Sequence, residues 1–222
     1  MPIDPNSDPN SHPIGTDEPG RHNWRAPRRA AASELSEVAP RLIVSGELPE
    51  GWEDAEAELR RWVEAGITDV VDVRIEADDR ALVTMLQPDV RYHRFPVHDD
   101  GRERTDDWFD RGTAAILEAL EDPRRRVLVH CAIGINRSSS LAYAAMLPSG
   151  RDAVEALDEV RRTRPIAVVL YAEDAVRWWH RRLESDVTTV RREIARVHDW
   201  FRRNVGSADW ITGRLGPLDD EG

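Results

Sequence analysis

Positions 130–138 read HCAIGINRS and contain the single cysteine of a 222-residue chain. The run 126–129 before this stretch is apolar after its first residue and predicts a short buried strand. Beyond Arg137, the spacing of Leu141, Ala144, Ala145 and Leu147 suits the buried face of a helix. The stretch therefore predicts a tight loop between a strand and a helix, with the cysteine at its entrance and an arginine at its exit.

A loop that leads into a helix N-terminus points backbone N–H groups and the positive end of the helix dipole toward its interior. That environment suits a phosphate dianion, and it also stabilises a thiolate, because helix N-termini and cations lower the pKa of a cysteine from ~8.5 to ~3.5–7.5. The Cys131 thiolate can attack phosphorus while Arg137 holds two phosphoryl oxygens in a bidentate fork. Ser138 places a hydroxyl near the sulfur, where it can stabilise the thiolate as a leaving group.

The pattern His-Cys-(x)5-Arg-Ser at positions 130–138 resembles the phosphate-binding loop of the cysteine-dependent protein tyrosine phosphatase superfamily. The surroundings are most similar to its dual-specificity branch, since residues 161–166 resemble the R-x-x-R-P turn of that branch. The resemblance implies that His130 supports the loop by hydrogen-bonding backbone around it. It also implies phosphate-binding positions at Ala132, Ile133, Gly134, Ile135, Asn136 and Arg137.

The predicted strand 67–74 ends in Asp72-x-Arg74, which resembles a pattern of bacterial phosphatases of this type. Asp72 and Arg74 are equally compatible with a place at the border of the active site and with a structural ion pair. The sequence leaves these two alternatives open.

A phosphatase of this type needs an acid that protonates the leaving oxygen. In the dual-specificity branch this acid lies on a mobile loop upstream of the cysteine, commonly at the spacing that separates Pro96 from Asp99. The resemblance therefore favours Asp99, which lies 32 residues before Cys131. Asp100, which precedes Gly101, is the alternative general acid. An acidic turn that only caps a helix is the structural alternative to both.

The composition bounds the partners and the compartment. A formal net charge of −11 argues against a nucleic-acid or anionic-membrane partner, because both favour clustered positive charge. One cysteine rules out an internal disulfide framework and suits a reducing compartment. Since neither a signal-peptide pattern nor an apolar run of membrane-spanning length is visible, we expect a soluble, cytoplasmic protein.

The expected fold is α/β, with a four- or five-stranded mixed sheet flanked by helices and the Cys131 loop at the end of a central strand. Strands are predicted at 41–46, 67–74, 90–97 and 126–129, and helices at 53–64, 78–86, 105–121, 138–147, 151–162, 174–184 and 187–203. The domain organisation is a disordered tail (1–36), a catalytic domain (37–185), an additional C-terminal helix (186–205) and a flexible acidic tail (206–222). The additional helix is expected to pack back on the domain, with dimer formation or partner binding as alternatives.

The predicted function is metal-independent and cofactor-independent hydrolysis of phosphotyrosine in proteins, with phosphoserine and phosphothreonine as further substrates. The loop positions Ala132, Ile133, Ile135 and Asn136 are uncharged. Members of the superfamily that hydrolyse inositol lipids tend to carry extra basic residues at these positions, which neutralise the neighbouring phosphates. The uncharged loop therefore disfavours a multiply phosphorylated inositol lipid as substrate. An RNA 5′-triphosphatase relative shares the Asn-Arg ending of the loop. A phosphatase of such non-protein substrates and a non-catalytic phospho-binding module are the alternative functions. The oligomeric state does not follow from the sequence.

Overall fold

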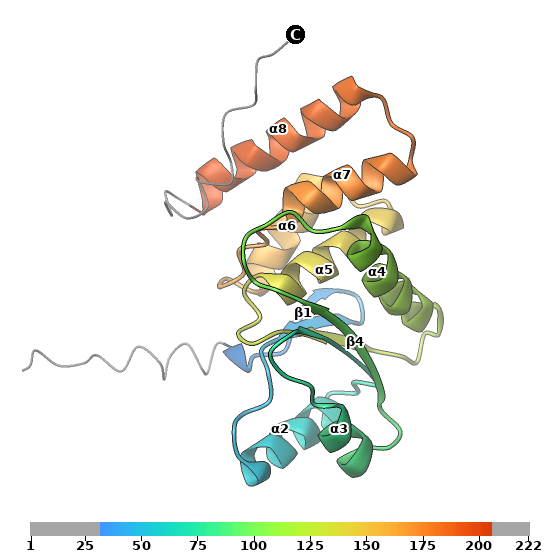
Figure 1. The fold of residues 1–222 in the computed structure, drawn as a ribbon, viewed down its shortest axis with the longest axis vertical. Coiled ribbons are helices and arrows are strands. Elements are labelled where there is room, and N and C mark those ends of the chain that lie inside the picture. The colour runs from blue at the N-terminus through green and yellow to red at the C-terminus, as the bar shows by residue number, and fades with distance from the viewer. Residues whose placement is uncertain (1–31, 206–222) are drawn as a thin grey trace, which may run out of the picture.

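The computed structural model describes residues 32–205, in which a five-stranded sheet lies between two helical layers (Figure 1). The strand order is β1-β2-β5-β3-β4, and only β1 runs antiparallel to its neighbour. The strands are β1 (Ser36–Ala39), β2 (Leu42–Ser45), β3 (Asp69–Arg74), β4 (Arg91–Val97) and β5 (Val127–His130). The predicted mixed sheet, with the Cys131 strand at its centre, is confirmed.

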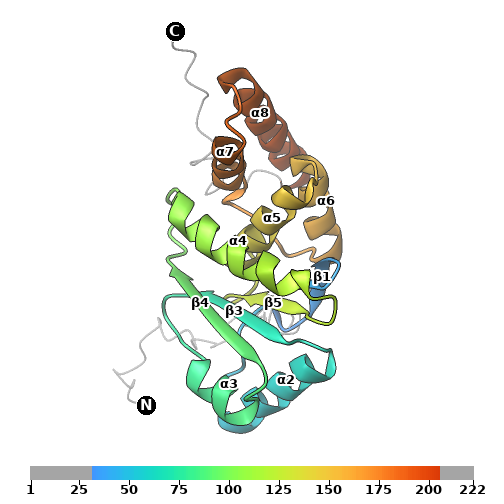
Figure 2. The same cartoon turned by 90° about the vertical axis from the view of Figure 1, so that its right-hand side faces the viewer.

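Helices cover both faces of the sheet (Figures 1 and 2). One face carries α2 (Trp52–Glu64) and α3 (Arg80–Leu86). The other carries α4 (Asp106–Glu121), α5 (Arg137–Met146), the short 3-10 helix η1 (Leu147–Ser149), α6 (Ala153–Thr163) and α7 (Ala172–Arg182). The last helix, α8 (Val187–Asn204), lies outermost and packs on α6 and α7.

The central strand β5 is buried along its whole length. Val127 and Val129 belong to the hydrophobic cluster on the α5 side, and Leu128 belongs to the cluster that contains Trp62 of α2. Because successive residues of a strand point to opposite faces, a strand covered on both sides needs apolar residues at every position. The same packing therefore explains the apolar run before Cys131 and holds the start of the loop rigid.

Strand β1, at the edge of the sheet, was not predicted from the sequence. Its four residues carry only one fully buried aliphatic side chain, Val38, so the strand is too short for its alternation to stand out. Ser36, which was assigned to the N-terminal tail, is the buried first residue of this strand. Residues 1–31 of the tail predicted over 1–36, and the whole tail predicted over 206–222, lie outside the described residues.

Helix α8 contributes to the main core. Ile194, Val197, Trp200 and Phe201 on its inner face are buried within the cluster on the α5 side of the sheet. In its C-terminal half, the Trp200 indole donates to Asp158 at 2.5 Å, and His198 Nε2 lies 2.8 Å from Glu173 Oε2. The helix therefore packs back on α6 and α7 in this chain. Among residues 32–205, no helix combines the length and apolar composition of a membrane span.

Candidate active site

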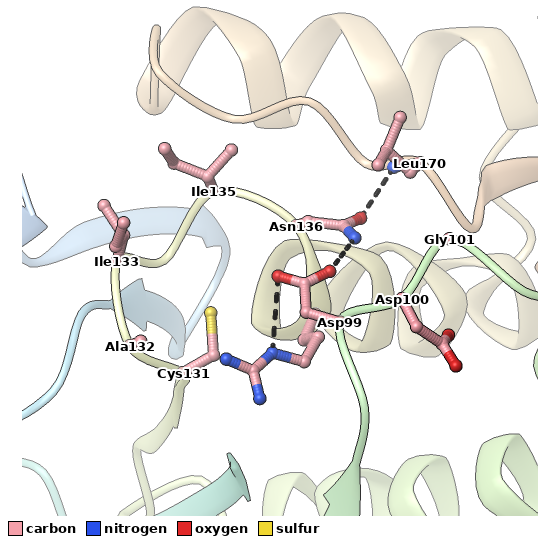
Figure 3. A pocket seen from close by; sticks show the side chains of 10 residues that line it. Asp99, Asp100, Gly101, Cys131, Ala132, Ile133, Ile135, Asn136 and Leu170 are labelled. Carbon is pink, nitrogen blue, oxygen red and sulfur yellow. Dashed lines mark hydrogen bonds and ion pairs between the residues drawn. The ribbon is translucent and has the colours of Figure 1, made fainter. Parts of the chain in front are cut away.

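The loop between β5 and α5 places the Cys131 sulfur at the base of a pocket (Figure 3). The thiol is free and nearly buried, with 2% of the residue exposed. Its Sγ accepts hydrogen bonds from the Gly134 backbone N–H and from Ser138 Oγ, each at 3.2 Å. Two donors directed at one sulfur stabilise negative charge on it. The structure therefore brings together three residues that the sequence assigned to this site.

The buried guanidinium of Arg164 holds the outer side of the loop. It donates to the carbonyl oxygens of Gly134 at 2.6 Å and Ile133 at 2.9 Å, and it also reaches the carbonyl of Glu34. In a trans peptide the N–H points opposite to the C=O, so carbonyls directed at Arg164 turn the following amides toward the pocket. The turn at 161–166 thus supports the phosphate-binding geometry from behind.

Gly134 occupies a position that only glycine fits. Its φ of +69° lies in the left-handed region, and a Cβ would lie 2.6 Å from the Ser45 carbonyl oxygen and would also meet the Arg164 guanidinium. Gly134→Ala is therefore expected to lower the free energy of unfolding by roughly 1–3 kcal/mol, measured by urea denaturation. Gly101→Ala is the matched control, because Gly101 also has positive φ but meets nothing within 4 Å. Equal losses in the two variants would contradict the steric account.

Arg137 is the first residue of α5 and is 4% exposed. Its two terminal nitrogens form a bidentate pair with Glu76 at 2.7 and 2.6 Å, and Nη1 lies 3.2 Å from the Val97 carbonyl. Burial alone would lower the pKa of Arg137, but the Glu76 carboxylate outweighs burial and raises it, so the guanidinium stays cationic. The same hydrogen bonds lower the pKa of Glu76 to about 2. Sequence reasoning missed Glu76, because no motif marks it.

Asp99 faces the loop from the turn after β4. Its Oδ1 accepts hydrogen bonds from Asn136 Nδ2 at 2.6 Å and from the Tyr171 hydroxyl at 3.2 Å. Its Oδ2 lies 3.5 Å from Arg137 Nε. The predicted general acid therefore shares the pocket with the predicted nucleophile.

Asp100 points away from the loop (Figure 3). Its Oδ1 accepts from the Arg104 guanidinium at 2.6 Å and from the Arg102 backbone N–H at 3.1 Å. The hydrogen bond from the Arg102 backbone, followed by that from Arg104, lowers the pKa of Asp100. Because Asp99 faces the loop and Asp100 points away from it, the geometry favours Asp99 over Asp100.

His130 lies beneath Cys131 and is fully buried. Burial lowers its pKa to about 4, so the ring is neutral, and it packs at 5.4 Å from the Trp62 ring. The resemblance implied a hydrogen bond from His130 to backbone around the loop. Within residues 32–205 neither ring nitrogen has a hydrogen-bond partner, and Nε2 lies 3.8 Å from Asp72 Oδ1. In this structure His130 therefore supports the cysteine by packing.

Asp72, Asp79 and His130 place one ligand atom each within 4.8 Å of one another, which is the spacing of a metal site. The Arg74 guanidinium, however, donates to Asp72 at 3.0 and 2.8 Å and also pairs with Asp79. A cation already sits between the two carboxylates, so a metal ion would have to displace Arg74. Of the two alternatives for Asp72 and Arg74, the structure therefore shows the structural ion pair.

The pocket above Cys131 has a volume of about 700 Å³. Apolar side chains form much of its rim, and Ile133 is 44% exposed there. The lining residues are Asp99, Asp100, Gly101, Cys131, Ala132, Ile133, Ile135, Asn136, Arg137 and Leu170. Every predicted site residue except Gly134, His130 and Ser138 lines this pocket, and Gly134 and Ser138 contact the sulfur directly.

A central strand that delivers a cysteine into an amide-lined loop, with a buried arginine and an upstream carboxyl, defines the cysteine-dependent phosphatase class. The family model for the dual specificity phosphatase catalytic domain matches residues 53–171, which is more than half of the chain. The protein belongs to this family.

Named relatives agree with this assignment. Mouse dual specificity protein phosphatase 13B is 31% identical over 143 residues, which are 63% of this chain and 69% of that protein. Human dual specificity protein phosphatase 18 is 35% identical over 81 residues, but the match spans only 40% of its length. A variant of human DUSP28 has a similar structure, with a TM-score of 0.54 and 25% identity over 68% of this chain and 96% of that one. The narrower resemblance to bacterial enzymes stays a prediction.

Proposed function

We propose that this protein hydrolyses phosphate monoesters on proteins, phosphotyrosine first among them, through a phospho-cysteine intermediate. Membership of the dual specificity phosphatase family supports this activity. The observation that carries the proposal is the Cys131 sulfur at the pocket base, with Gly134 N–H and Ser138 Oγ each 3.2 Å away and Asp99 opposite.

The first step transfers the phosphoryl group to sulfur. The Cys131 thiolate attacks phosphorus in line with the ester oxygen, so that an S–P bond forms while the P–O bond breaks. Arg137 and the inward-facing amides of residues 132–137 stabilise the charge on the equatorial oxygens. Asp99 gives its proton to the departing oxygen, which leaves as the free hydroxyl.

The second step regenerates the enzyme. A water molecule attacks phosphorus, the Asp99 carboxylate takes a proton from that water, and the S–P bond breaks. The departing sulfur keeps the bonding electrons, and the hydrogen bond from Ser138 stabilises it as a thiolate. Inorganic phosphate is released, and Asp99 is protonated again for the next cycle.

The rim of the pocket supports an aromatic phosphate ester as substrate. Ile133, Ile135 and Leu170 offer apolar contact to a phenyl ring above the loop. Arg137 is the one basic residue among those that line the pocket, so little would neutralise the additional phosphates of an inositol lipid. We therefore propose phosphotyrosine as the preferred ester, with phosphoserine and phosphothreonine reached less efficiently.

The test is hydrolysis of a phosphotyrosine peptide by the purified full chain in the presence of a chelator. We expect turnover to be unaffected by the chelator and to exceed that of a matched phosphoinositide or an RNA 5′-triphosphate. A requirement for added metal, or a clear preference for either non-protein substrate, would contradict the proposal.

The acid is tested by leaving-group dependence. Asp99→Ala is expected to lower kcat by about 10²–10⁴-fold for an ester with a basic leaving group, because that oxygen needs a proton to depart. The loss is expected to shrink for a strongly acidic leaving group, which departs without help. Asp100→Ala is the matched control, with little change for either ester. A larger loss in Asp100→Ala would transfer the role to Asp100.

A further inference from the structure

The two oxygens of the Asp99 carboxyl have different surroundings. Oδ1 receives the two hydrogen bonds from Asn136 Nδ2 and the Tyr171 hydroxyl, at 2.6 and 3.2 Å. Oδ2 receives neither, and lies beside Arg137 Nε at 3.5 Å. A carboxylic acid carries its proton on one oxygen only, so unequal surroundings determine which oxygen that is.

The Asn136 amide cannot exchange its nitrogen and oxygen. Its Oδ1 accepts from the Leu170 backbone N–H at 2.8 Å (Figure 3) and from Ser140 Oγ at 3.2 Å. A flipped amide would place its own N–H groups against the Leu170 N–H and leave a buried donor without an acceptor. Asn136 is 4% exposed, so water does not relieve that loss. Its Nδ2 is therefore fixed toward Asp99.

The Tyr171 side chain is also held in one position by its neighbours. It is fully buried, the Arg104 guanidinium lies 4.6 Å above its ring, and the Trp108 ring meets it edge-on at 6.5 Å. Arg104 also donates to the carbonyl oxygen of His98 at 2.8 Å, so the same side chain links the ring to the turn that carries Asp99.

The Tyr171 hydroxyl acts as a donor to Asp99. Burial, and next the negative charge of Asp99, raise the pKa of Tyr171, so the phenol keeps its proton. The other acceptor near it, the His98 carbonyl oxygen, is more distant at 3.4 Å.

We propose that Asn136 and Tyr171 are positioning residues that reserve Oδ2 of Asp99 for the proton exchanged during catalysis. A proton on Oδ1 would point at two donors, whereas a proton on Oδ2 leaves both hydrogen bonds intact. Oδ2 then gives its proton to the leaving oxygen and takes one from the attacking water, next to the arginine that binds the phosphoryl group. This inference rests on the proposed function and adds to it two residues that hold Asp99 in place.

The experiment measures kcat for a series of aryl phosphates whose leaving groups differ in basicity. Tyr171→Phe removes the hydroxyl and keeps the ring, and we expect kcat to fall about tenfold for the most basic leaving group. For the most acidic leaving group we expect kcat within about twofold of wild type, with KM unchanged throughout. Tyr143→Phe is the matched control, since Tyr143 is equally buried and its hydroxyl has no hydrogen-bond partner in the described part of the chain. Asn136→Ser provides a second variant, and its kcat is likewise expected to fall more for the most basic leaving group than for the most acidic one.

A double mutant separates positioning from structure. In the Asp99→Ala background, Tyr171→Phe is expected to have no further effect, because the group it positions is absent. A loss that is equal for all leaving groups, no loss for any, or a full loss that persists without Asp99 would each overturn the inference. Failure of the proposed function looks different: wild type itself would not turn over, or Asp99→Ala would show no leaving-group dependence, and the inference would fall with it.

Discussion

Cys131→Ser is expected to lower kcat for a phosphotyrosine peptide by on the order of 10⁴-fold or more. A serine hydroxyl is not ionised near neutral pH. Within residues 32–205 the hydrogen bonds at this position come from Gly134 N–H and Ser138 Oγ, and neither group is a base. The hydrogen bonds from Gly134 N–H and Ser138 Oγ stabilise an anion, and an oxygen in the same position would merely accept them as a neutral group. The loss therefore falls on the chemical step.

Binding of inorganic phosphate provides the control for this variant. Serine is close to cysteine in volume, so the buried loop and Arg137 are expected to stay in place, and phosphate affinity is expected to remain within a few-fold of wild type. Turnover within about tenfold of wild type would show that the sulfur is not the nucleophile.

Arg137→Lys is expected to lower kcat by roughly 10²–10³-fold, with a smaller change in phosphate binding. The guanidinium is planar. Its Nη1 and Nη2 donate hydrogen bonds to Glu76, while its Nε faces the pocket beside Asp99. An ammonium is a single point of charge that cannot serve both sides at once. It is expected to pair with Glu76 and to leave the transition-state oxygens without their fork.

Arg181→Lys is the matched control for the arginine-to-lysine change. Arg181 of α7 also makes a two-nitrogen pair with a carboxylate, that of Asp106, but this pair lies on the surface and outside the pocket. Its kcat is expected to remain within about twofold of wild type, because exposed ion pairs contribute little. Near-normal turnover by Arg137→Lys would remove Arg137 from its proposed role.

Much of the fold follows from local patterns in the sequence. The apolar run before Cys131 predicts β5 because both faces of a central strand must be apolar, and α8 follows from its regularly spaced Ile194, Val197 and Phe201. Strand β1 does not follow, because its four residues are only partly buried, unlike those of β2 and β5, and it lies at the edge of the sheet beside β2 alone. Local periodicity predicts elements that are long or fully buried.

The site divides in the same way. Cys131, Arg137 and Ser138 are close in sequence, so their spacing alone brings them together. The choice between Asp99 and Asp100 is different, because adjacent side chains of a turn point in different directions and distant partners decide which one faces inward. Here those partners are Asn136 and Tyr171 on one side and Arg104 on the other. Glu76 and Tyr171 were not predicted for the same reason. Each is far in sequence from its partner in the site, and the tertiary fold alone brings them into contact.

The proposed mechanism depends on transfer of phosphate to the sulfur of Cys131. The most direct test is rapid acid quenching of the Ser138→Ala variant during turnover of labelled phosphotyrosine peptide, followed by mapping of the label. Ser138 donates its hydrogen bond to the departing sulfur, so its loss is expected to slow the second step and let the intermediate accumulate. The account predicts covalent label on Cys131 and a burst of released tyrosine peptide before steady turnover. Label on another residue, or turnover with neither a burst nor covalent label, would contradict it.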